Sequence, residues 1–392
     1  MLVSSLPSEL LEEIMELLDK QDLLACALVC QALLGRCRRH LFQNKLEVIE
    51  LVPRNISRFA QVIRSPHCTL GPYICSIYAR RYYWASEDSV FTFIAPLLRR
   101  LPAVRSLRFR LQVLVNGTTV DDHFRQGFVT GFPHVTRLHL HCTFEQVRPI
   151  YPAPLQDLIA CFPACVDLEI ESLSNARIAS SSNARPPPEL HSVSLCQDAA
   201  KPILIWLDAA GHLGKITTLA LPLLRVDVDD DDDIISIREA LEKMGQTLRK
   251  LVVPFSQEFD SQFDPEMLRA LDLSRFSNLQ ALIINDVSEF YNLEDGQGQT
   301  ARLVGFVTQL QASTLEEISI SLPASSYSGL ESWALFDAHF ASHRFPSLRR
   351  MTLEDPRQDK GFFRTALPKL FASGVLRVLD AVPVQFVAED SK

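Results

Sequence analysis

The sequence predicts an α/β solenoid, in which short parallel strands alternate with helices, preceded by a small all-helical domain. The first observation is an apolar pattern, Φ-x-x-Φ-x-Φ with Φ an apolar residue, whose ten copies are spaced 25 to 36 residues apart. Such alternation is typical of a strand that is buried on one face only. The second observation is that the apolar spacing between these copies changes to the helical period. A strand and a helix repeated at this interval form the unit of a solenoid.

The strand patterns share three apolar positions. They are Val104-Leu107-Phe109, Val135-Leu138-Leu140, Cys165-Leu168-Ile170, Leu190-Val193-Leu195, Ile216-Leu219-Leu221, Leu248-Leu251-Val253, Leu279-Leu282-Ile284, Leu315-Ile318-Ile320, Leu348-Met351-Leu353 and Leu376-Leu379-Ala381. Weaker copies at residues 46–51 and 74–78 extend the array toward the N-terminus. Because the intervening residues are mostly polar, we expect one open sheet face. The alternative, a doubly wound α/β domain, requires strands that are covered on both faces.

Amphipathic helices are expected between the strands, at residues 90–101, 155–162, 203–213, 234–244, 265–273, 302–310, 333–340 and 362–371. Loops that enter the strands are short and often contain Phe-Pro, as at 132–133, 162–163 and 345–346. Several loops that leave the strands are long and polar, at 174–188, 227–233, 256–264, 288–300 and 323–332. In a solenoid such insertions gather on one rim, which is often the binding rim.

One strand and one helix in each unit resemble irregular leucine-rich repeats. The Asn or Cys position of the regular repeat is not consistently present in this sequence. The resemblance implies a horseshoe-shaped solenoid with its parallel strands on the concave face. The number of repeats and the curvature stay open.

The N-terminal stretch, residues 6–42, predicts three short helices. In the first helix, apolar residues form one face and glutamates fill the other, with Pro7 in the first turn. Asp22 is the expected N-cap of the second helix. Three helices in so short a segment cannot bury all of their apolar surface among themselves. Part of that surface is therefore expected to be an interface.

The spaced residues Leu6-Pro7, Glu9-Leu10-Leu11, Ile14, Leu17-Leu18, Asp22-Leu23, Val29-Cys30 and Leu41-Phe42 resemble the F-box motif. The wording Ala-Cys-Ala-Leu-Val-Cys, followed by His-Leu-Phe, is similar to the fungal mushroom-type F-box. Leu33 and Phe42 stand where many F-boxes have Trp. The resemblance implies binding to a Skp-type adaptor and, through it, to a cullin-RING ubiquitin ligase. The adaptor-facing residues would be drawn from Leu6, Pro7, Leu10, Ile14, Leu17, Leu23, Val29 and Cys30, although some of these must pack the helices together.

The composition is that of a folded protein, with 47% hydrophobic residues among 392 and a mean hydropathy of +0.07. No apolar run is long enough to span a membrane, and we expect no signal peptide. Nine cysteines without paired spacing indicate reduced thiols, and hence the cytoplasm or the nucleus. A net charge of −8 argues against general nucleic-acid binding.

Motifs for catalysis or metal binding are weak. The aspartate run 229–233 lacks the alternating ligands, Gly turn and closing Glu of a calcium loop. His139 and His141 share one face of a strand, but no second ligand pair accompanies them. The sequence contains no phosphate-binding Gly-rich loop, nucleophile elbow or Ser-His-Asp set. We therefore expect neither an enzyme nor a cofactor or metal site.

The outward positions of three successive strands carry charge. Arg108, Arg110 and Arg137 are expected to form one basic patch, and the following strand provides acidic residues that would pair with it. Solvated residues without a partner are the alternative, as are the rim loops. The predicted substrate-binding residues are Arg108, Arg110, Arg137, His139, Asp167 and Glu169.

The sequence thus predicts a substrate-recognition subunit of an SCF-type (Skp-cullin-F-box) ubiquitin ligase. Its F-box would bind the Skp adaptor and its repeats an unknown protein substrate. The alternative is a non-catalytic scaffold that binds an adaptor, or nothing at all, without promoting ubiquitination. The predicted domains are an F-box at 1–45, the solenoid at 46–385 and a tail at 386–392.

Overall fold

The computed structural model describes residues 6–29, 31–41, 49–51, 53–65, 68–81, 101–114, 132–145, 155–174, 183–222, 231–255, 271–286, 296–322, 327, 329–355 and 360–380. The chain divides into two compact units, Met1–Leu190 and His191–Lys392. The first unit holds the N-terminal helices and the strands β1 to β5, and the second holds β6 to β12. The predicted domain limits remain predictions.

The first unit begins with three helices, α1 (Ser8–Leu17), α2 (Lys20–Val29) and α3 (Gln31–His40). Pro7 lies at the N-cap position of α1, one residue before the helix begins. The prediction that Asp22 caps the second helix is wrong. The side chain of Asp19 accepts a hydrogen bond from the backbone N–H of Asp22 at 2.8 Å, so the earlier aspartate satisfies that first-turn donor.

Five parallel strands follow in the first unit, in the order of the sequence. They are β1 (Ile49–Leu51), β2 (Ser76–Arg81), β3 (Ser106–Leu114), β4 (Arg137–Glu145) and β5 (Asp167–Ser174). The helical elements between them are α4 (Pro53–Arg64), the short 3-10 helix η3 (Gly71–Tyr73) and α7 (Leu155–Ala160). Helix α4 was not predicted. The weaker strand patterns at 46–51 and 74–78 coincide with β1 and β2.

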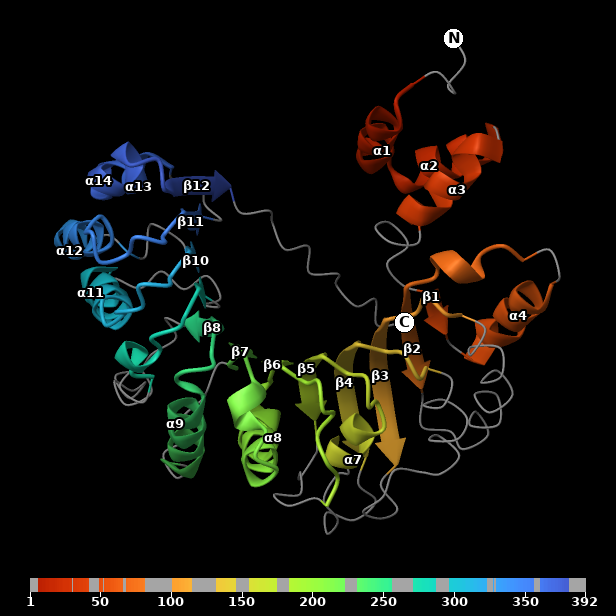
Figure 1. The fold of residues 1–392 in the computed structure, drawn as a ribbon, viewed down its shortest axis with the longest axis horizontal. Coiled ribbons are helices and arrows are strands. Elements are labelled where there is room, and N and C mark those ends of the chain that lie inside the picture. The colour runs from red at the N-terminus through yellow and green to blue at the C-terminus, as the bar shows by residue number, and fades with distance from the viewer. Residues whose placement is uncertain are drawn as a thin grey trace. The chain divides into compact units, whose positions relative to one another are not determined.

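The second unit repeats the same alternation. Its strands are β6 (Ser192–Ser194), β7 (Thr218–Ala220), β8 (Lys250–Phe255), β9 (Ala281–Asp286), β10 (Glu317–Ser321), β11 (Arg350–Asp355) and β12 (Leu376–Asp380). Its helical elements are α8 (Gln197–Ala209), η6 (Leu213–Lys215), α9 (Asp231–Met244), η7 (Leu273–Arg275), α11 (Gly296–Val307), α12 (Leu330–Phe340), α13 (Lys360–Ala366) and α14 (Pro368–Ala372). Neighbouring strands are parallel, and the helices lie on one side of them (Figure 1).

Except in the last pattern, the predicted apolar positions that the structure describes face the core, with Leu348 only half-buried. In the pattern Leu107–Phe109, for example, both side chains are fully buried, as are Leu251 and Val253 in the second unit. The last pattern is out of phase. Met351 pairs with Leu376 in the register of β11 and β12, so Leu376 is the inward residue and Leu379 is 46% exposed. Apolar residues at 376, 378 and 379 fit two phases, which sequence alone does not separate.

A short turn precedes most strands and explains the Phe-Pro dipeptides. A backbone bond from Cys165 N–H to Phe162 O, 2.9 Å long, closes one such turn, and both residues are buried. Proline suits the second position of this kind of turn because its fixed φ matches the required conformation. The same closure joins Leu101 to Val104, Phe132 to Val135, Pro187 to Leu190, Leu213 to Ile216, Phe276 to Leu279, Ala312 to Leu315 and Phe345 to Leu348.

A backbone ladder joins successive repeats within each unit. The carbonyl of Arg105 accepts hydrogen bonds from the N–H groups of Thr136 and Arg137, at 2.8 and 2.9 Å. The carbonyls of Cys75, Thr136, His191, Thr217, Arg249, Gln280 and Glu316 do the same for the repeat that follows each of them. This ladder needs no particular side chain. It therefore explains how the repeats keep register without a regular Asn or Cys.

The predicted helices at 155–162, 203–213, 234–244, 302–310 and 333–340 coincide with α7, α8, α9, α11 and α12. The single helix predicted at 362–371 is wrong, because the chain forms α13 and α14 with Leu367 between them. Pro368 has no N–H to continue α13, and it begins α14 instead. The predictions at 90–100 and 265–270 lie outside the described residues, as do most of the long loops.

Together these elements confirm the predicted fold class, three N-terminal helices followed by a parallel α/β solenoid. Within the ranges that the structure covers, no helix is long and apolar enough to cross a bilayer. Among the cysteines that the structure describes, Cys26, Cys68 and Cys165 are free thiols. Burial raises the pKa of the Cys165 thiol to about 12, which makes it an inert core residue.

Candidate functional site

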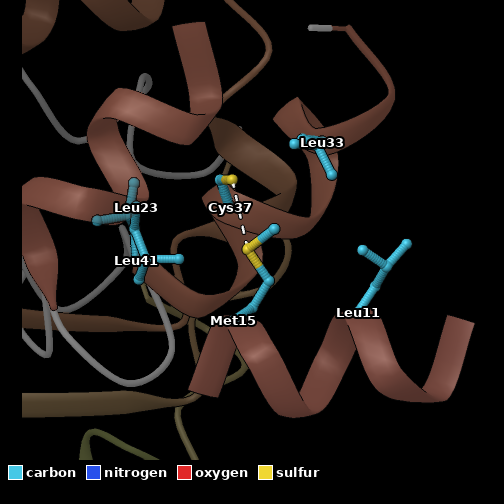
Figure 2. Close-up of a cluster of buried hydrophobic side chains, with 6 residues drawn as sticks. All are labelled: Leu11, Met15, Leu23, Leu33, Cys37 and Leu41. Atoms are coloured by element: carbon cyan, nitrogen blue, oxygen red, sulfur yellow. Dashed lines mark hydrogen bonds between the residues drawn. The ribbon is translucent and has the colours of Figure 1, made fainter. Parts of the chain in front are cut away.

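The three N-terminal helices enclose a small core of their own. Figure 2 shows its buried side chains converging from α1, α2 and α3 and from the residue that follows α3, with the Cys37 thiol 3.7 Å from the Met15 sulfur. The cluster consists of Leu11, Met15, Leu23, Leu33, Cys37 and Leu41. Because Leu11 and Met15 are one helical turn apart, they fix which face of α1 is turned inward.

A polar tie fixes α1 against α3. The carboxylate of Glu12 lies 2.7 Å from His40 Nε2 and 2.5 Å from Arg36 Nη1. Arg36 also donates to the carbonyl of Ser8, at 3.3 Å. The hydrogen bond with His40, together with the charges of Arg36, His40 and Arg39, lowers the pKa of Glu12 against the effect of burial. Glu12 therefore stays ionised and holds the two helices together.

The outer face of these helices is apolar and exposed. On α1, Leu10, Ile14 and Leu17 recur at the spacing of one helical face, and Leu17 is 87% exposed. On α2, Leu28 and Val29 are 89% and 72% exposed. Leu6 and Leu24 are also exposed. Soluble proteins rarely leave such a group of large apolar side chains in water unless a partner covers it.

The predicted adaptor-facing residues divide into three groups. Leu6, Pro7, Leu10, Ile14, Leu17 and Val29 are exposed. Leu23 is fully buried in the core of the three helices, so it stabilises the domain and has no surface to offer a partner. Cys30 lies outside the described residues. Leu24 and Leu28 were missed, because α2 carries apolar residues on all sides and its period singles out no face.

A second surface lies on the open face of β2 to β5, the face opposite the buried apolar positions. The strand registers place Tyr78, Arg108, His139 and Glu169 side by side, one on each strand. Arg108 lies over the ring of Tyr78, with its guanidinium carbon 5.8 Å from the ring centroid. This cation–π contact was not predicted, because it depends on the register between two strands 25 residues or more apart in sequence.

The charged residues of this face pair with one another. His139 contacts two carboxylates, with Nδ1 2.9 Å from Glu169 Oε2 and Nε2 2.7 Å from Glu171 Oε2. Glu171 also accepts from Arg108 Nη2 at 2.9 Å. Arg137 and Asp167 form a separate, more exposed pair, 3.4 Å apart. Arg110 lies opposite His141 in the register of β3 and β4.

His139 is a cation in this arrangement. Ionised carboxylates only accept hydrogen bonds, so both ring nitrogens must carry a proton. Burial alone would lower the pKa of His139, but the bonds to Glu169 and Glu171 outweigh burial and raise the pKa above its ordinary value. The hydrogen bond with His139 also lowers the pKa of Glu169. Arg108, His139, Glu169 and Glu171 thus form one connected group of charges.

Other possible sites are less developed. A hollow of about 500 Å³ beside α9 and η7 is lined by charged residues, but its Arg275 is already bound to Glu242 at 2.6 Å and to Asp272 at 3.0 Å. No group of three or more potential metal ligands occurs within the part of the chain that the structure describes. The aspartate run continues into α9, and nothing is described of its side chains.

Comparison with known proteins identifies the N-terminal helices. Residues 3–45 match the F-box-like family, so this segment is an F-box-like domain. No curated protein matches the chain significantly in sequence. The crystal structure of a protein from Bacteroides fragilis aligns over 86% of this chain and 75% of its own, at 14% identity and a TM-score of 0.36. That similarity is too low to support an argument, and the fold assignment rests on the strands and helices themselves.

Proposed function

We propose that the chain is the substrate-recognition subunit of an SCF-type ubiquitin ligase. Its F-box-like domain would bind a Skp-type adaptor, which F-box domains generally bind, and the adaptor would connect it to a cullin-RING ligase. The repeats would hold the protein to be ubiquitinated. The proposed place of action is the cytoplasm or the nucleus.

The observation that carries this proposal is the exposed apolar face of an F-box-like domain with a closed core. Because Leu11, Met15 and Leu23 already fill that core, Leu10, Ile14 and Leu17 are not needed to fold the domain. They remain in water unless a partner covers them. An amphipathic helix that binds a hydrophobic groove places its anchor residues at positions such as i, i+4 and i+7. Leu10, Ile14 and Leu17 have this spacing.

In this proposal the protein performs no chemistry of its own. Its contribution is proximity, because it brings a lysine of the substrate near a ubiquitin-charged enzyme elsewhere in the complex. An F-box-like domain at residues 3–45, followed along the chain by an array of parallel strands, supports this assignment. The F-box-like domain supports adaptor binding, and the charged face of β2 to β5 offers a surface for the substrate.

The first test is an Ile14→Asp variant, assayed for binding to a purified Skp-type adaptor. A carboxylate buried without a partner in the interface should weaken adaptor binding by about 3 kcal/mol, or roughly 100-fold in Kd. Val62→Asp is the matched control, because Val62 on α4 is 47% exposed and Ile14 is 42% exposed. Replacing Leu6 and Pro7 by alanine should also weaken binding. Equal Kd values for the Ile14 and Val62 variants, with circular dichroism unchanged, would sink the adaptor assignment.

A pull-down with adaptor and cullin then separates a ligase subunit from a scaffold. The wild-type chain should recover both proteins, and Ile14→Asp should lose both together. Recovery of adaptor without cullin would contradict the ligase role and leave an adaptor-binding scaffold. The same preparation, with the proteasome inhibited in the cells of origin, is the most direct way to capture substrates.

A further inference from the structure

The carboxylate of Glu171 occupies a position that three basic side chains share. Its Oε2 atom lies 2.9 Å from Arg108 Nη2, 2.7 Å from His139 Nε2 and 3.8 Å from His141 Nδ1. The basic residues belong to β3 and β4, and Glu171 belongs to β5. The Glu171 side chain therefore extends across β4 to reach Arg108 on the strand beyond it.

A β-bulge gives Glu171 this reach. The register between β4 and β5 shifts between Leu140 and His141, where Leu140 pairs with Ile170 and His141 with Ser172. Ile170 and Leu173 are both buried, so Glu171 and Ser172 stand together on the open side. Bulges commonly re-aim a side chain while bending the strand locally. Here the bulge places one carboxylate over the basic residues of the neighbouring strands.

We propose that Arg108, His139 and His141 form a carboxylate-binding site for an acidic segment of the substrate, and that Glu171 occupies this site until the segment displaces it. This inference rests on the proposed function as a substrate receptor. Glu171 is the chain's own example of the ligand class, a carboxylate held between an arginine and a histidine.

The carboxylate already in the site favours an acidic partner over a basic one. Arg108 and His139 both bind Glu171 Oε2, and His141 lies 3.8 Å from the same atom. Because these basic side chains share a single oxygen of Glu171, a segment with several carboxylates would offer them more acceptors. A basic segment would instead have to compete with donors already in place.

The neighbours of the site would keep its donors in position during the exchange. Tyr78 lies under the Arg108 guanidinium, and Glu169 holds Nδ1 of His139 at 2.9 Å. Both contacts persist when Glu171 leaves, so Arg108 and His139 stay oriented. The side chains of Arg108 and Glu171 are 47% and 44% exposed, and pairs as exposed as this one are weak enough to exchange with a competitor.

The test measures binding of a fluorescent hexaglutamate peptide to the full-length chain by anisotropy at low ionic strength, where surface charges are least screened. Glu171→Gln removes the internal competitor and should tighten binding about fivefold, which equals about 1 kcal/mol. Arg108→Gln should weaken binding by at least as much. A hexalysine peptide should bind no better to Glu171→Gln than to the wild-type chain.

Glu317→Gln is the matched control. Glu317 pairs with Arg350 at 2.7 Å across the open face of β10 and β11, so its loss changes the net charge equally and also frees an arginine. Its effect on peptide binding should be small. An equal gain from Glu317→Gln and Glu171→Gln would overturn the site, because it would show general charge attraction only. No gain from Glu171→Gln would overturn it as well.

The peptide-binding result does not depend on adaptor binding, which is measured separately with the same variants. Arg108→Gln and Glu171→Gln should both bind the Skp-type adaptor with unchanged Kd, because neither residue belongs to the F-box-like domain. Unchanged adaptor binding with unaltered peptide binding would refute the carboxylate site and leave the receptor function intact. Thermal melting of each variant establishes that a lost signal does not come from unfolding.

Discussion

His339 lies at the end of α12 among aromatic rings, 4.9 Å from the ring centroid of Phe340 and 5.2 Å from that of Phe345. Its Nε2 atom is buried without a hydrogen-bond partner. Burial, with a smaller effect of the Arg344 charge, lowers the pKa of His339 below its ordinary value, although a hydrogen bond with the backbone of Leu310 opposes the shift. The folded protein therefore favours a neutral imidazole at this position.

This lowered pKa predicts the sign of one pH dependence. The unfolded chain takes up the proton near the ordinary pKa of 6.5, while the folded chain resists it, so acidification through that value favours unfolding. The free energy of unfolding of His339→Leu, relative to wild type, should therefore rise between pH 8 and about pH 5. Urea denaturation at the two pH values measures this difference. A difference that stays constant between the two pH values would refute the prediction.

The pKa of His139 is shifted in the opposite direction from that of His339, so the stability of the variant must be compared with that of the wild type at each pH. Its raised pKa contributes stability below the ordinary value, and this contribution is lost as the pH rises through the raised value. The two histidines oppose each other in the pH profile of the whole chain. Subtracting wild type removes the contribution of His139 and of every other group that the substitution leaves unchanged.

At the scale of elements, Asp337 connects two neighbouring helices of the second unit. Its side chain lies in α12 and is only 2% exposed. Its two oxygens accept hydrogen bonds from the backbone N–H groups of Lys369 and Leu370, at 3.1 and 2.9 Å. These donors belong to the first turn of α14, where Pro368 leaves no N–H of its own. A carboxylate is favourable there because it also meets the positive end of the helix dipole.

Asp337→Ala should destabilise the second unit by about 3 kcal/mol, because one buried and one partly buried backbone donor lose a charged acceptor. Asp337→Asn should cost less, since one carbonyl oxygen remains to accept. Denaturant unfolding measures both values. Asp208→Ala is the control: that exposed aspartate pairs with Lys243 at 2.6 Å on the surface, and its loss should change stability little. Equal losses for the variants at positions 337 and 208 would contradict the capping role.

The repeat elements were predictable because their signal is local. A strand with alternating apolar residues and a preceding Phe-Pro turn lies within about ten residues, so short-range patterns reveal it. Register, by contrast, is a property of two strands. The bulge that presents Glu171 and the phase of β12 depend on pairing with β4 and β11, which lies beyond any local pattern. Pro368 marks the break between α13 and α14 in the sequence, but the apolar residues on either side of it predict one continuous helix.

At the scale of the whole molecule, the sequence predicts the two candidate surfaces, the apolar face of the F-box-like domain and the charged face of β2 to β5, to different degrees. Leu10, Ile14 and Leu17 recur on one helical face, and that face is exposed, whereas their binding to an adaptor stays a prediction. The spacing of apolar residues could not show that Leu23 fills the core. In a three-helix domain each helix carries apolar residues both for the core and for an exposed face. The pairing of basic and acidic strands was expected from the order of charges, whereas the cation–π support by Tyr78 was not.

The apolar face of the F-box-like domain also predicts how the whole chain behaves without a partner. Expressed alone, the chain should elute as large species in size-exclusion chromatography, because these apolar side chains are exposed. Co-expression with a Skp-type adaptor should restore a single complex if, as proposed, the adaptor covers Leu10, Ile14 and Leu17. Ile14→Asp should reduce self-association of the chain alone while abolishing rescue by the adaptor. Leu335→Asp is the control, because Leu335 is 67% exposed on α12 of the second unit. If the Leu335 variant disperses the chain and the Ile14 variant does not, self-association comes from the repeats, and the F-box-like face is not the surface that requires a partner.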